Sequence, residues 1–438
     1  MESLKTLDEA LDYLYSFINY ETDSSFPYEA LHYNVERTVE LLNLMGNPHQ
    51  GKIIIHVAGT KGKGSICKII ATLLEARNLR VGLFTSPHIE KVNERIVVDG
   101  RQIEDLEIVE IINELVPLIE RFPKDNQPTT FEILTAAAMH YFNIKGADHV
   151  VLETGMGGRF DSTNFSDPVV SVISPISIDH TDKLGEEIHL IAKEKAGIIK
   201  PGKPVVVGYQ RHEVEGIFRE RSRKLKSKYY NVRESCSYTI QEMDETGTLF
   251  DAMIDGSSYK GLFLSLPGVH QVENAVTSLL ALKVIDLLPS EQIMKSVFGD
   301  ICFPTRLELI KKERRFLLDS AHNRDSAEAL VSAIKALYRY DKLFTIVGIV
   351  KGKDVEGIVG SLASVSDEMI VCEPVTHKEL DTAHVFDTAK RFLPHCRLIA
   401  DIYDAIHAAV HESAEDDLIL VTGSFYTTSP VRSYLLDN

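Results

Sequence analysis

Two long stretches of the chain alternate short runs of β-branched and aliphatic residues with segments in which apolar residues recur at helical spacing. In the first stretch the apolar runs lie at residues 53–57, 81–85, 149–153, 169–174 and 204–208. In the second they lie at residues 315–320, 343–350, 368–373, 397–400 and 418–422. Alternation of this kind is typical of parallel strands joined by crossover helices. The sequence therefore predicts an α/β protein with two parallel sheets.

The region between the two stretches has a different pattern. Residues 211–228 are polar and basic, the following residues up to Leu266 are strand-like and rich in turn formers, and a helical pattern runs from Gln271 to near Leu288. We interpret the basic segment as a solvated helix face, with a binding patch as the less favoured alternative. The segment GDICFPTR at 299–306 then interrupts the pattern with Gly, Asp and Pro. We predict a domain boundary there, between domains of residues 1–299 and 300–438.

Composition narrows the possible partners. The 438 residues include 47 Lys and Arg against 64 Asp and Glu, which gives a formal net charge of −17. Broad binding of nucleic acid or of an anionic membrane needs a surplus of basic residues. Neither partner is therefore expected, although a local basic pocket stays open. With 44% hydrophobic and 25% charged residues, the composition is that of a globular protein and excludes intrinsic disorder.

The expected location follows from features that the sequence lacks. No apolar run approaches the roughly 20 residues that cross a bilayer, and the N-terminal residues lack the basic and apolar segments of a signal peptide. The five cysteines are far apart and form no C-x-x-C pair, which argues against a disulfide framework or a zinc site. We expect a soluble, cytoplasmic protein.

A glycine-rich turn follows the first predicted strand directly. Residues 58–65 read AGTKGKGS, and apolar residues recur at helical spacing after them. The glycines let backbone N–H groups converge on an anion, and the helix N-terminus adds the positive end of its dipole. Lys63 can reach the terminal phosphates of a nucleotide. The sequence thus predicts a phosphate loop (P-loop) that binds ATP, in an ATP-binding domain of residues 1–299.

The match to the general pattern G-x-x-x-x-G-K-[ST] is incomplete. Val57 stands at the position of the first glycine, Gly64 follows Lys63, and the hydroxyl arrives one place late at Ser65. An ordinary strand-to-helix loop therefore stays open as an alternative. If the segment is a phosphate loop, the Mg²⁺ of the nucleotide needs ligands from elsewhere in the chain.

Candidate ligands and further motifs follow in a fixed order. In the first half they are TSPH at 85–88, NERI at 93–96, ETGMGGRFDSTN at 153–164, DHTD at 179–182 and EKAG at 194–197. In the second half they are LPGVHQVENA at 266–275, PTRLE at 304–308, LDSAHN at 318–323 and TGSFY at 422–426. With GTKGKGS, this ordered set resembles folylpolyglutamate synthase and its bifunctional dihydrofolate synthase form, within the Mur ligase superfamily.

The resemblance implies a Mur ligase-like fold, with a P-loop ATPase domain followed by a smaller, Rossmann-like glutamate-ligase domain. It also implies a reaction. ATP activates the γ-carboxylate of a folate as an acyl phosphate, and the amino group of L-glutamate attacks to give an amide, ADP and phosphate. Dihydropteroate stays open as a second acceptor. The implied partners are these small molecules, and a monomer is expected.

The resemblance also implies roles for single residues. The expected ATP ligands are Gly59, Thr60, Gly62, Lys63, Gly64, Ser65, Asn274, Arg306 and Asp319. The expected Mg²⁺ ligands are Ser86, Glu153 and His180, with His88 as a competitor for the place of His180. The expected catalytic residues are Lys63, Lys195 and His322. The expected substrate contacts are Phe131, Glu132, Phe160, Asp161 and Ser162 for the pterin, and Ser424 and Tyr426 for glutamate or the acyl phosphate.

Lys195 matches a lysine that is carbamylated in relatives and supports a second metal ion, with a plain helical lysine as the alternative. Several positions depart from the family pattern: Thr305 and Ser320 stand where glycine is usual, Lys61 where asparagine is common, and Phe165-Ser166 where an aliphatic pair is usual. Two other classes of function stay open. One is a Mur-type ligase with a different carboxylate substrate, and the other is a switch that uses ATP only to change conformation.

Overall fold

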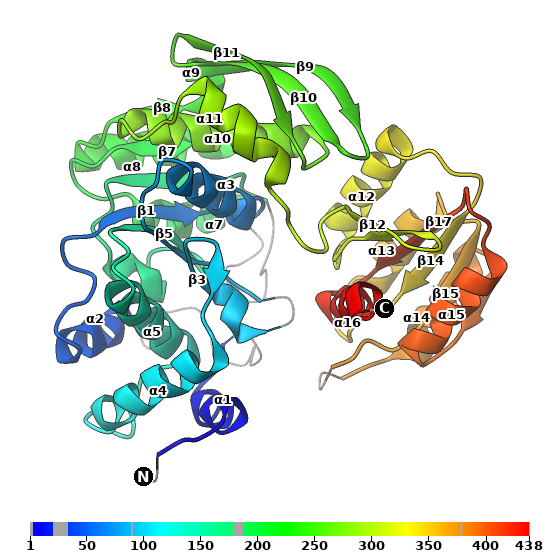
Figure 1. Ribbon diagram of the computed structural model, residues 1–438, viewed down its shortest axis with the longest axis horizontal. Coiled ribbons are helices and arrows are strands. Elements are labelled where there is room, and N and C mark those ends of the chain that lie inside the picture. Colours follow the sequence, from blue (N-terminus) through cyan, green and yellow to red (C-terminus); the bar gives the residue numbers. More distant parts are fainter. Residues whose placement is uncertain (1–2, 21–33, 89–90, 178–186, 377–378, 438) are drawn as a thin grey trace. The chain divides into compact units, whose positions relative to one another are not determined.

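The computed structural model describes residues 3–20, 34–88, 91–177, 187–376 and 379–437 (Figure 1). The chain divides into two compact units. The first comprises Met1–Gln241, Leu249–Phe263 and Val269–Ile301, and the second comprises Glu242–Thr248, Leu264–Gly268 and Cys302–Asn438. Two short segments of the second unit, 242–248 and 264–268, thus precede the predicted boundary near residue 300.

The first unit is built on an eight-stranded sheet with the order β4-β3-β2-β5-β1-β6-β7-β8. Its strands are β1 (Ile53–Ala58), β2 (Val81–Phe84), β3 (Ile96–Val98), β4 (Arg101–Gln102), β5 (His149–Glu153), β6 (Val170–Ile173), β7 (Val205–Val207) and β8 (Tyr229–Asn231). Neighbours from β2 to β8 are parallel, whereas β3 and β4 are antiparallel additions at one edge. The five strands predicted for this stretch are present, and β8 falls in the region predicted to be strand-like after residue 228. Strands β3 and β4 were not predicted.

Helices cover both faces of this sheet (Figure 1). They are α1 (Leu7–Tyr15), α2 (Val35–Leu44), α3 (Lys63–Glu75), α4 (Asp105–Ile119), α5 (Thr130–Ile144), α7 (Ile188–Lys195), α8 (His212–Leu225), α9 (Val232–Ser235), α10 (Val269–Val284) and α11 (Glu291–Val297). Helices α1, α2, α4 and α5 share one apolar core with the sheet, and α7 and α8 share another. Because both faces are covered, the parallel strands consist almost wholly of apolar residues.

Helix α8 confirms the interpretation of the basic segment. Its apolar residues Val214 and Phe218 are buried, while Arg219, Arg223 and Lys224 are exposed. The strand-like region after it forms a three-stranded sheet of β9 (Cys236–Asp244), β10 (Gly247–Ile254) and β11 (Ser257–Leu264). The next helix, α10, ends at Val284, earlier than the predicted end near Leu288.

The second unit has a six-stranded sheet with the order β12-β13-β17-β14-β15-β16. Its strands are β12 (Glu308–Lys311), β13 (Arg315–Leu318), β14 (Leu343–Val347), β15 (Glu368–Val371), β16 (Cys396–Leu398) and β17 (Leu418–Thr422), and only β12 is antiparallel to its neighbour. Its helices are α12 (Arg324–Leu337), α13 (Val355–Ala363), α14 (Thr382–Phe392), α15 (Ile402–Glu412) and α16 (Phe425–Asp437). The first three helices share one core and the last two share a second, so the sheet is again covered on both faces.

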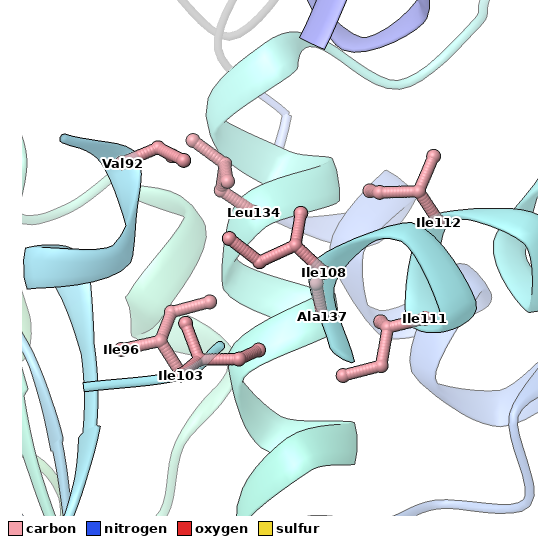
Figure 2. Close-up of a pocket in the computed structure, with 8 residues that line it drawn as sticks. All are labelled: Val92, Ile96, Ile103, Ile108, Ile111, Ile112, Leu134 and Ala137. Carbon is pink, nitrogen blue, oxygen red and sulfur yellow. The ribbon is translucent and has the colours of Figure 1, made fainter. Parts of the chain in front are cut away.

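A small cavity in the first unit lies between α4, α5 and the segment that leads into β3 and β4 (Figure 2). Its lining is entirely aliphatic, and consists of Val92, Ile96, Ile103, Ile108, Ile111, Ile112, Leu134 and Ala137. Since none of these side chains has a polar group or is a predicted site residue, the cavity is a packing feature of the core. Among the described helices, none is long and apolar enough to cross a membrane.

Candidate active site

The register of the central strands brings the predicted residues of the first unit to one edge of the sheet. Strand β1 lies between β5 and β6, with Val57 opposite Glu153 and Ala58 opposite Ile173. Strand β2 lies on the other side of β5, with Phe84 opposite Leu152. Because these strands are parallel, the glycine-rich loop, Glu153 and the Ser86 segment all emerge at the same edge, where open α/β sheets bind ligands.

Two glycines of the loop are required by close contacts. A Cβ atom on Gly59 would overlap the Ser174 hydroxyl at the end of β6. Gly62 has a positive φ of 80° and caps the N-terminus of α3, and a Cβ there would overlap Asn274 Oδ1 of α10. The loop is therefore packed between β6 and α10 in a form that only glycine fits.

The first half of the loop is held by the protein itself. The N–H groups of Thr60 and Lys61 donate to Pro175 O at 3.0 and 3.1 Å, and Thr60 Oγ1 donates to Ser177 O at 3.2 Å. The second half is different, because α3 begins at Lys63 with no side-chain cap and no acidic residue in its first turn. The uncapped N–H groups of a helix N-terminus form an anion site.

Two lysines and one carboxylate surround this loop. Lys63 Nζ lies 3.8 Å from Glu153 Oε1, and Glu153 Oε2 accepts the N–H of Ser86 at 3.2 Å. Lys195, at the end of α7, donates from Nζ to Gly59 O at 2.7 Å, although it lies far along the chain. Glu153 and Lys195 are each only 4% exposed. The structure thus brings Lys63, Glu153, Ser86 and Lys195 together around one turn of chain.

The predicted pterin contacts gather around the loop that follows β5. The ring of Phe131, in the first turn of α5, lies 5.7 Å from that of Phe84. A Cβ on Gly155 would overlap the Phe131 ring. The backbone after Glu153 therefore lies directly on the Phe131 ring.

Glu132, the neighbour of Phe131, is fully engaged inside the protein. Arg37 of α2 donates to it from Nη2 to Oε1 at 2.8 Å and from Nε to Oε2 at 2.9 Å. Oε2 also accepts the N–H of Thr129, which completes a capping box at the start of α5. The Glu132 side chain thus joins α2 to α5 and holds the turn that presents Phe131.

The buried side chain of Asp161 holds the loop that follows β5 through hydrogen bonds to the backbone of that loop. Its Oδ2 accepts the N–H of Met156 at 2.8 Å, and its Oδ1 accepts the N–H of Thr163 at 3.0 Å as well as the Thr163 hydroxyl. His56 of β1 lies behind it, with Nε2 2.8 Å from Thr163 Oγ1. Burial raises the pKa of Asp161 and lowers that of His56 to about 3, so the histidine is neutral.

The remaining two pterin candidates lie beside Asp161. Ser162 Oγ is 2.6 Å from Thr135 Oγ1 of α5. The Phe160 ring is covered by the guanidinium of Arg159, whose carbon Cζ lies 4.3 Å from the ring centroid. The loop is therefore bound to α5 on one side and carries an aromatic ring on the other.

In the second unit, Arg306 and Asp319 lie near each other. Asp319 is 9% exposed and accepts the N–H groups of Leu307 and Ala321, each at 3.0 Å. Burial raises the pKa of Asp319, and the charge of Arg306 acts in the opposite direction. The guanidinium carbon of Arg306 lies 5.0 Å from the centroid of the Phe425 ring. Asp319 thus holds the segment that carries Arg306.

The three remaining site residues of the second unit differ in exposure and in hydrogen bonding; they are His322, Ser424 and Tyr426. His322 Nδ1 lies 3.0 Å from Ser320 O, which assigns the ring proton to Nδ1 and the lone pair to Nε2. Ser424 is 3% exposed and donates from Oγ to Gly348 O at 3.0 Å. Tyr426 is 36% exposed. Of the three, Ser424 is the most deeply built into the fold.

Comparison with known proteins agrees with this geometry. The family model of the Mur ligase middle domain matches residues 57–282, and that of the Mur ligase glutamate ligase domain matches residues 305–425. The dihydrofolate synthase/folylpolyglutamate synthase of Bacillus subtilis is 31% identical over 96% of this chain and 100% of its own length. The chain belongs to this family of Mur ligases. It is an ATP-dependent glutamate ligase of the folylpolyglutamate synthase and dihydrofolate synthase type.

Solved structures of the family have the same fold. The crystal structure of folylpolyglutamate synthase from Thermotoga maritima superposes with a TM-score of 0.87 at 30% identity, and covers 98% of this chain and 96% of its own. Escherichia coli FolC in complex with DHPP and ADP gives a TM-score of 0.83 at 26% identity, with 100% and 99% coverage. The predicted family, fold class and ligase activity are thereby confirmed.

The donor set of this ligase suits Mg²⁺ where the structure describes it. Ser86 and Glu153 lie together and offer the oxygen atoms that this hard cation prefers. His180 lies outside the described residues, so its predicted place beside them stays a prediction. Within the described ranges, no group of three or more His, Cys, Asp or Glu side chains could hold a metal ion.

Two hydroxyl residues at the same edge were missed by the sequence analysis. Thr154 follows Glu153, and Ser174 follows β6 beside Gly59. Both are 0% exposed, and the described part of the chain offers no hydrogen-bond partner to either hydroxyl oxygen. Buried hydroxyls without a partner are rare in folded proteins. The signal available in the sequence was their place at the ends of predicted strands.

Proposed function

We propose that the chain joins L-glutamate both to a reduced folate and to dihydropteroate, and that the edge of the sheet described above binds the reacting phosphates. The observation that carries the assignment of the site is the convergence of Lys63, Glu153, Ser86 and Lys195 on the glycine-rich loop at the uncapped N-terminus of α3. The two activities are supported by the Bacillus subtilis relative, whose name carries both.

The chemical problem is the meeting of two anions, a carboxylate and the terminal phosphate of ATP. Lys63 and the N–H groups of the first turn of α3 stabilise the charge that develops during phosphoryl transfer. Mg²⁺, held by Ser86 and Glu153 and by the predicted ligand His180, would neutralise phosphate charge when bound. Since Lys63 lies 3.8 Å from Glu153, beyond hydrogen-bonding distance, it can turn towards a phosphate without breaking a tight bond.

Lys195 is compatible with either of its two predicted forms. As an amine it holds the loop through Gly59 O. As a carbamate it would place an anion beside the phosphate loop and support a second cation. The intact mass of the purified protein distinguishes the two forms, because the carbamate adds one CO₂ to the chain.

The pterin is assigned to the surface made by Phe131 and the 155–163 loop, with Phe160 as a second ring. Asp161, Ser162 and Glu132 act there as supports of the loop and of α5, because their polar atoms are engaged inside the protein. In the second unit, Arg306 and Asp319 are proposed as nucleotide ligands, and Asn274 has this role in the first. His322, Ser424 and Tyr426 are assigned to glutamate or the acyl phosphate.

The decisive experiment measures phosphate release by the purified protein with ATP and Mg²⁺. A ligase releases phosphate only when both an acceptor and L-glutamate are present, whereas an ATP-dependent switch needs neither. Dihydropteroate and tetrahydrofolate are assayed side by side, and turnover with only one of them rejects the dual activity. Lys63→Ala is expected to lower turnover by about 100-fold or more, because it removes a charge that stabilises the transition state. Lys68→Ala, on the same helix α3, is the matched control, and near-normal turnover of Lys63→Ala rejects the phosphate-loop assignment.

A further inference from the structure

Three buried hydroxyl groups in the second unit form a hydrogen-bonded chain. Ser320 Oγ donates to Thr305 Oγ1 at 2.9 Å and lies 2.6 Å from Thr428 Oγ1. In the second contact either hydroxyl can be the donor, and Thr428 Oγ1 also donates to Ser424 O at 3.2 Å. All three residues are 0% exposed. Ser320 is the member whose hydroxyl contacts both of the others.

The chain of hydroxyls connects three segments of the proposed site. Thr305 precedes Arg306, Ser320 follows Asp319, and Thr428 lies one turn after Ser424 on α16 with its Oγ1 3.2 Å from Ser424 O. Ser320 is the central member, and its backbone N–H also donates to Thr305 O at 3.0 Å. A change at Ser320 is thus transmitted first to Thr305 and to the residue beside it.

The backbone around Arg306 is held in an unfavourable form. Thr305 has a φ of 54° and Leu307 a φ of 49°, a region that residues with a Cβ seldom adopt and that is worst for a β-branched residue such as threonine. Asp319 Oδ2 holds Leu307 through its N–H at 3.0 Å, and Glu308 Oε2 holds that of Thr305 at 2.7 Å. Since Arg306 stands between two such residues, its direction depends on both.

We infer that Ser320 is a positioning residue for the ligase reaction: its hydroxyl holds Thr305 in the left-handed conformation and so fixes the direction of Arg306, the proposed ATP ligand. This inference rests on the proposed function, in which Arg306 binds ATP. Glycine adopts positive φ without cost, so a chain with glycine at position 305 has no need of the hydroxyl. The departures from the family pattern at Thr305 and Ser320 are thus one linked feature, because the two side chains are hydrogen-bonded to each other.

The first test is Ser320→Ala in the full-length protein. Loss of one buried hydrogen bond is expected to lower kcat/KM for ATP about tenfold, with the KM for dihydropteroate unchanged. Thr305→Val removes the same hydrogen bond and keeps the shape of the side chain. It replaces Ser320→Ala as the test variant if Ser320→Ala does not fold. The matched control is Ser366→Ala, because Ser366 Oγ lies 2.6 Å from Thr345 Oγ1 in a similarly buried pair that contacts none of the proposed site residues.

Two double variants separate positioning from general stability. Thr305→Gly is expected to restore most of the kcat/KM for ATP in the Ser320→Ala background, because glycine takes the required conformation unaided. In the Arg306→Ala background, Ser320→Ala is expected to have no further effect, since it acts through the arginine.

Three results overturn the inference: a Ser320→Ala protein that is kinetically normal, one that loses no more than Ser366→Ala, or one that Thr305→Gly does not rescue. Failure of the proposed function itself is recognised separately, because the wild-type protein would then not form the glutamyl product at all.

Discussion

The buried ion pair between Arg37 and Glu132 allows a prediction with a defined magnitude. Arg37 makes two hydrogen bonds to the carboxylate, at 2.8 and 2.9 Å, and the two side chains are only 7% and 5% exposed. Arg37→Met keeps much of the side-chain volume and leaves Glu132 buried with the N–H of Thr129 as its remaining partner among the contacts described above. Loss of one member of a buried pair costs about 3–5 kcal/mol of folding free energy.

The same reasoning orders the other variants. Glu132→Gln leaves the guanidinium of Arg37 without its counter-charge, so it is expected to destabilise the protein by a similar amount. The double variant Arg37→Met/Glu132→Leu has no buried charge to compensate, and its cost is expected to be smaller than that of either single variant. A double variant that is more stable than either single variant shows that each charge stabilises the fold only by compensating the other.

Thermal unfolding of the variants measures these costs. At about 2 °C per kcal/mol for a large domain, the single variants are expected to unfold about 6–10 °C below the wild type. Initial rates then decide between support and substrate contact. If Glu132 supports Phe131, Arg37→Met and Glu132→Gln raise the KM for dihydropteroate alike; if Glu132 touches substrate, Glu132→Gln alone does so. Single variants that unfold within about 1 °C of the wild type, or a double variant less stable than both, would refute the reasoning.

Three further predictions concern the phosphate loop and the loop after β5. Gly62→Ala forces a Cβ against Asn274 at a φ of 80° and is expected to lower phosphate release at least tenfold, whereas Gly46→Ala, with a φ of 79° and open space around it, loses only stability. Burial lowers the pKa of His56 to about 3. In the unfolded chain a histidine has a pKa near 6.5, so below that pH protonation favours the unfolded state. The free energy of unfolding of the wild type therefore falls by about 1.4 kcal/mol per pH unit below pH 6.5 on account of His56. Denaturant unfolding of His56→Gln between pH 6.5 and 4 should lack this contribution to the pH dependence. Asp161→Asn exchanges an acceptor for a donor inside its loop and is expected to raise the KM for dihydropteroate while the KM for ATP stays unchanged in initial-rate assays.

The central strands were predictable because a strand that is buried on both faces of a sheet appears in the sequence as a continuous apolar run. The runs that became β1, β5 and β17 consist mostly of Ile, Val and Leu, as expected for parallel strands covered by helices on both sides. The strands β3, β4 and β12 were missed because they are short, lie at sheet edges and pair in antiparallel fashion. A strand of two to four residues is too short for an alternation of polar and apolar residues to be recognised.

The motifs predict the candidate site as a set of positions, whereas the hydrogen-bond partners of the side chains come from the structure alone. The motifs predict Glu132 and Ser424 as substrate contacts, and in the structure Glu132 is hydrogen-bonded to Arg37 and Ser424 to Gly348 O. A motif records that a residue type is required at a position and does not say whether it touches the ligand or a neighbour. The partners that decide this, Arg37 among them, lie far away in the sequence and belong to no motif.

The electrostatics of the first unit show why an acidic protein can bind anions. The net charge of −17 repels ATP at long range, but that repulsion is screened over about 8 Å in physiological salt. Close to the glycine-rich loop, this repulsion is opposed by the positive charges of Lys63 and the buried Lys195 and by the positive dipole end of α3 at its uncapped N-terminus. Glu153 lies next to Lys63 and would cancel its charge, unless a cation is bound to Glu153 itself. With Mg²⁺ bound to Glu153, as proposed above, the carboxylate would no longer offset the charge of Lys63, and that charge would act on the phosphates.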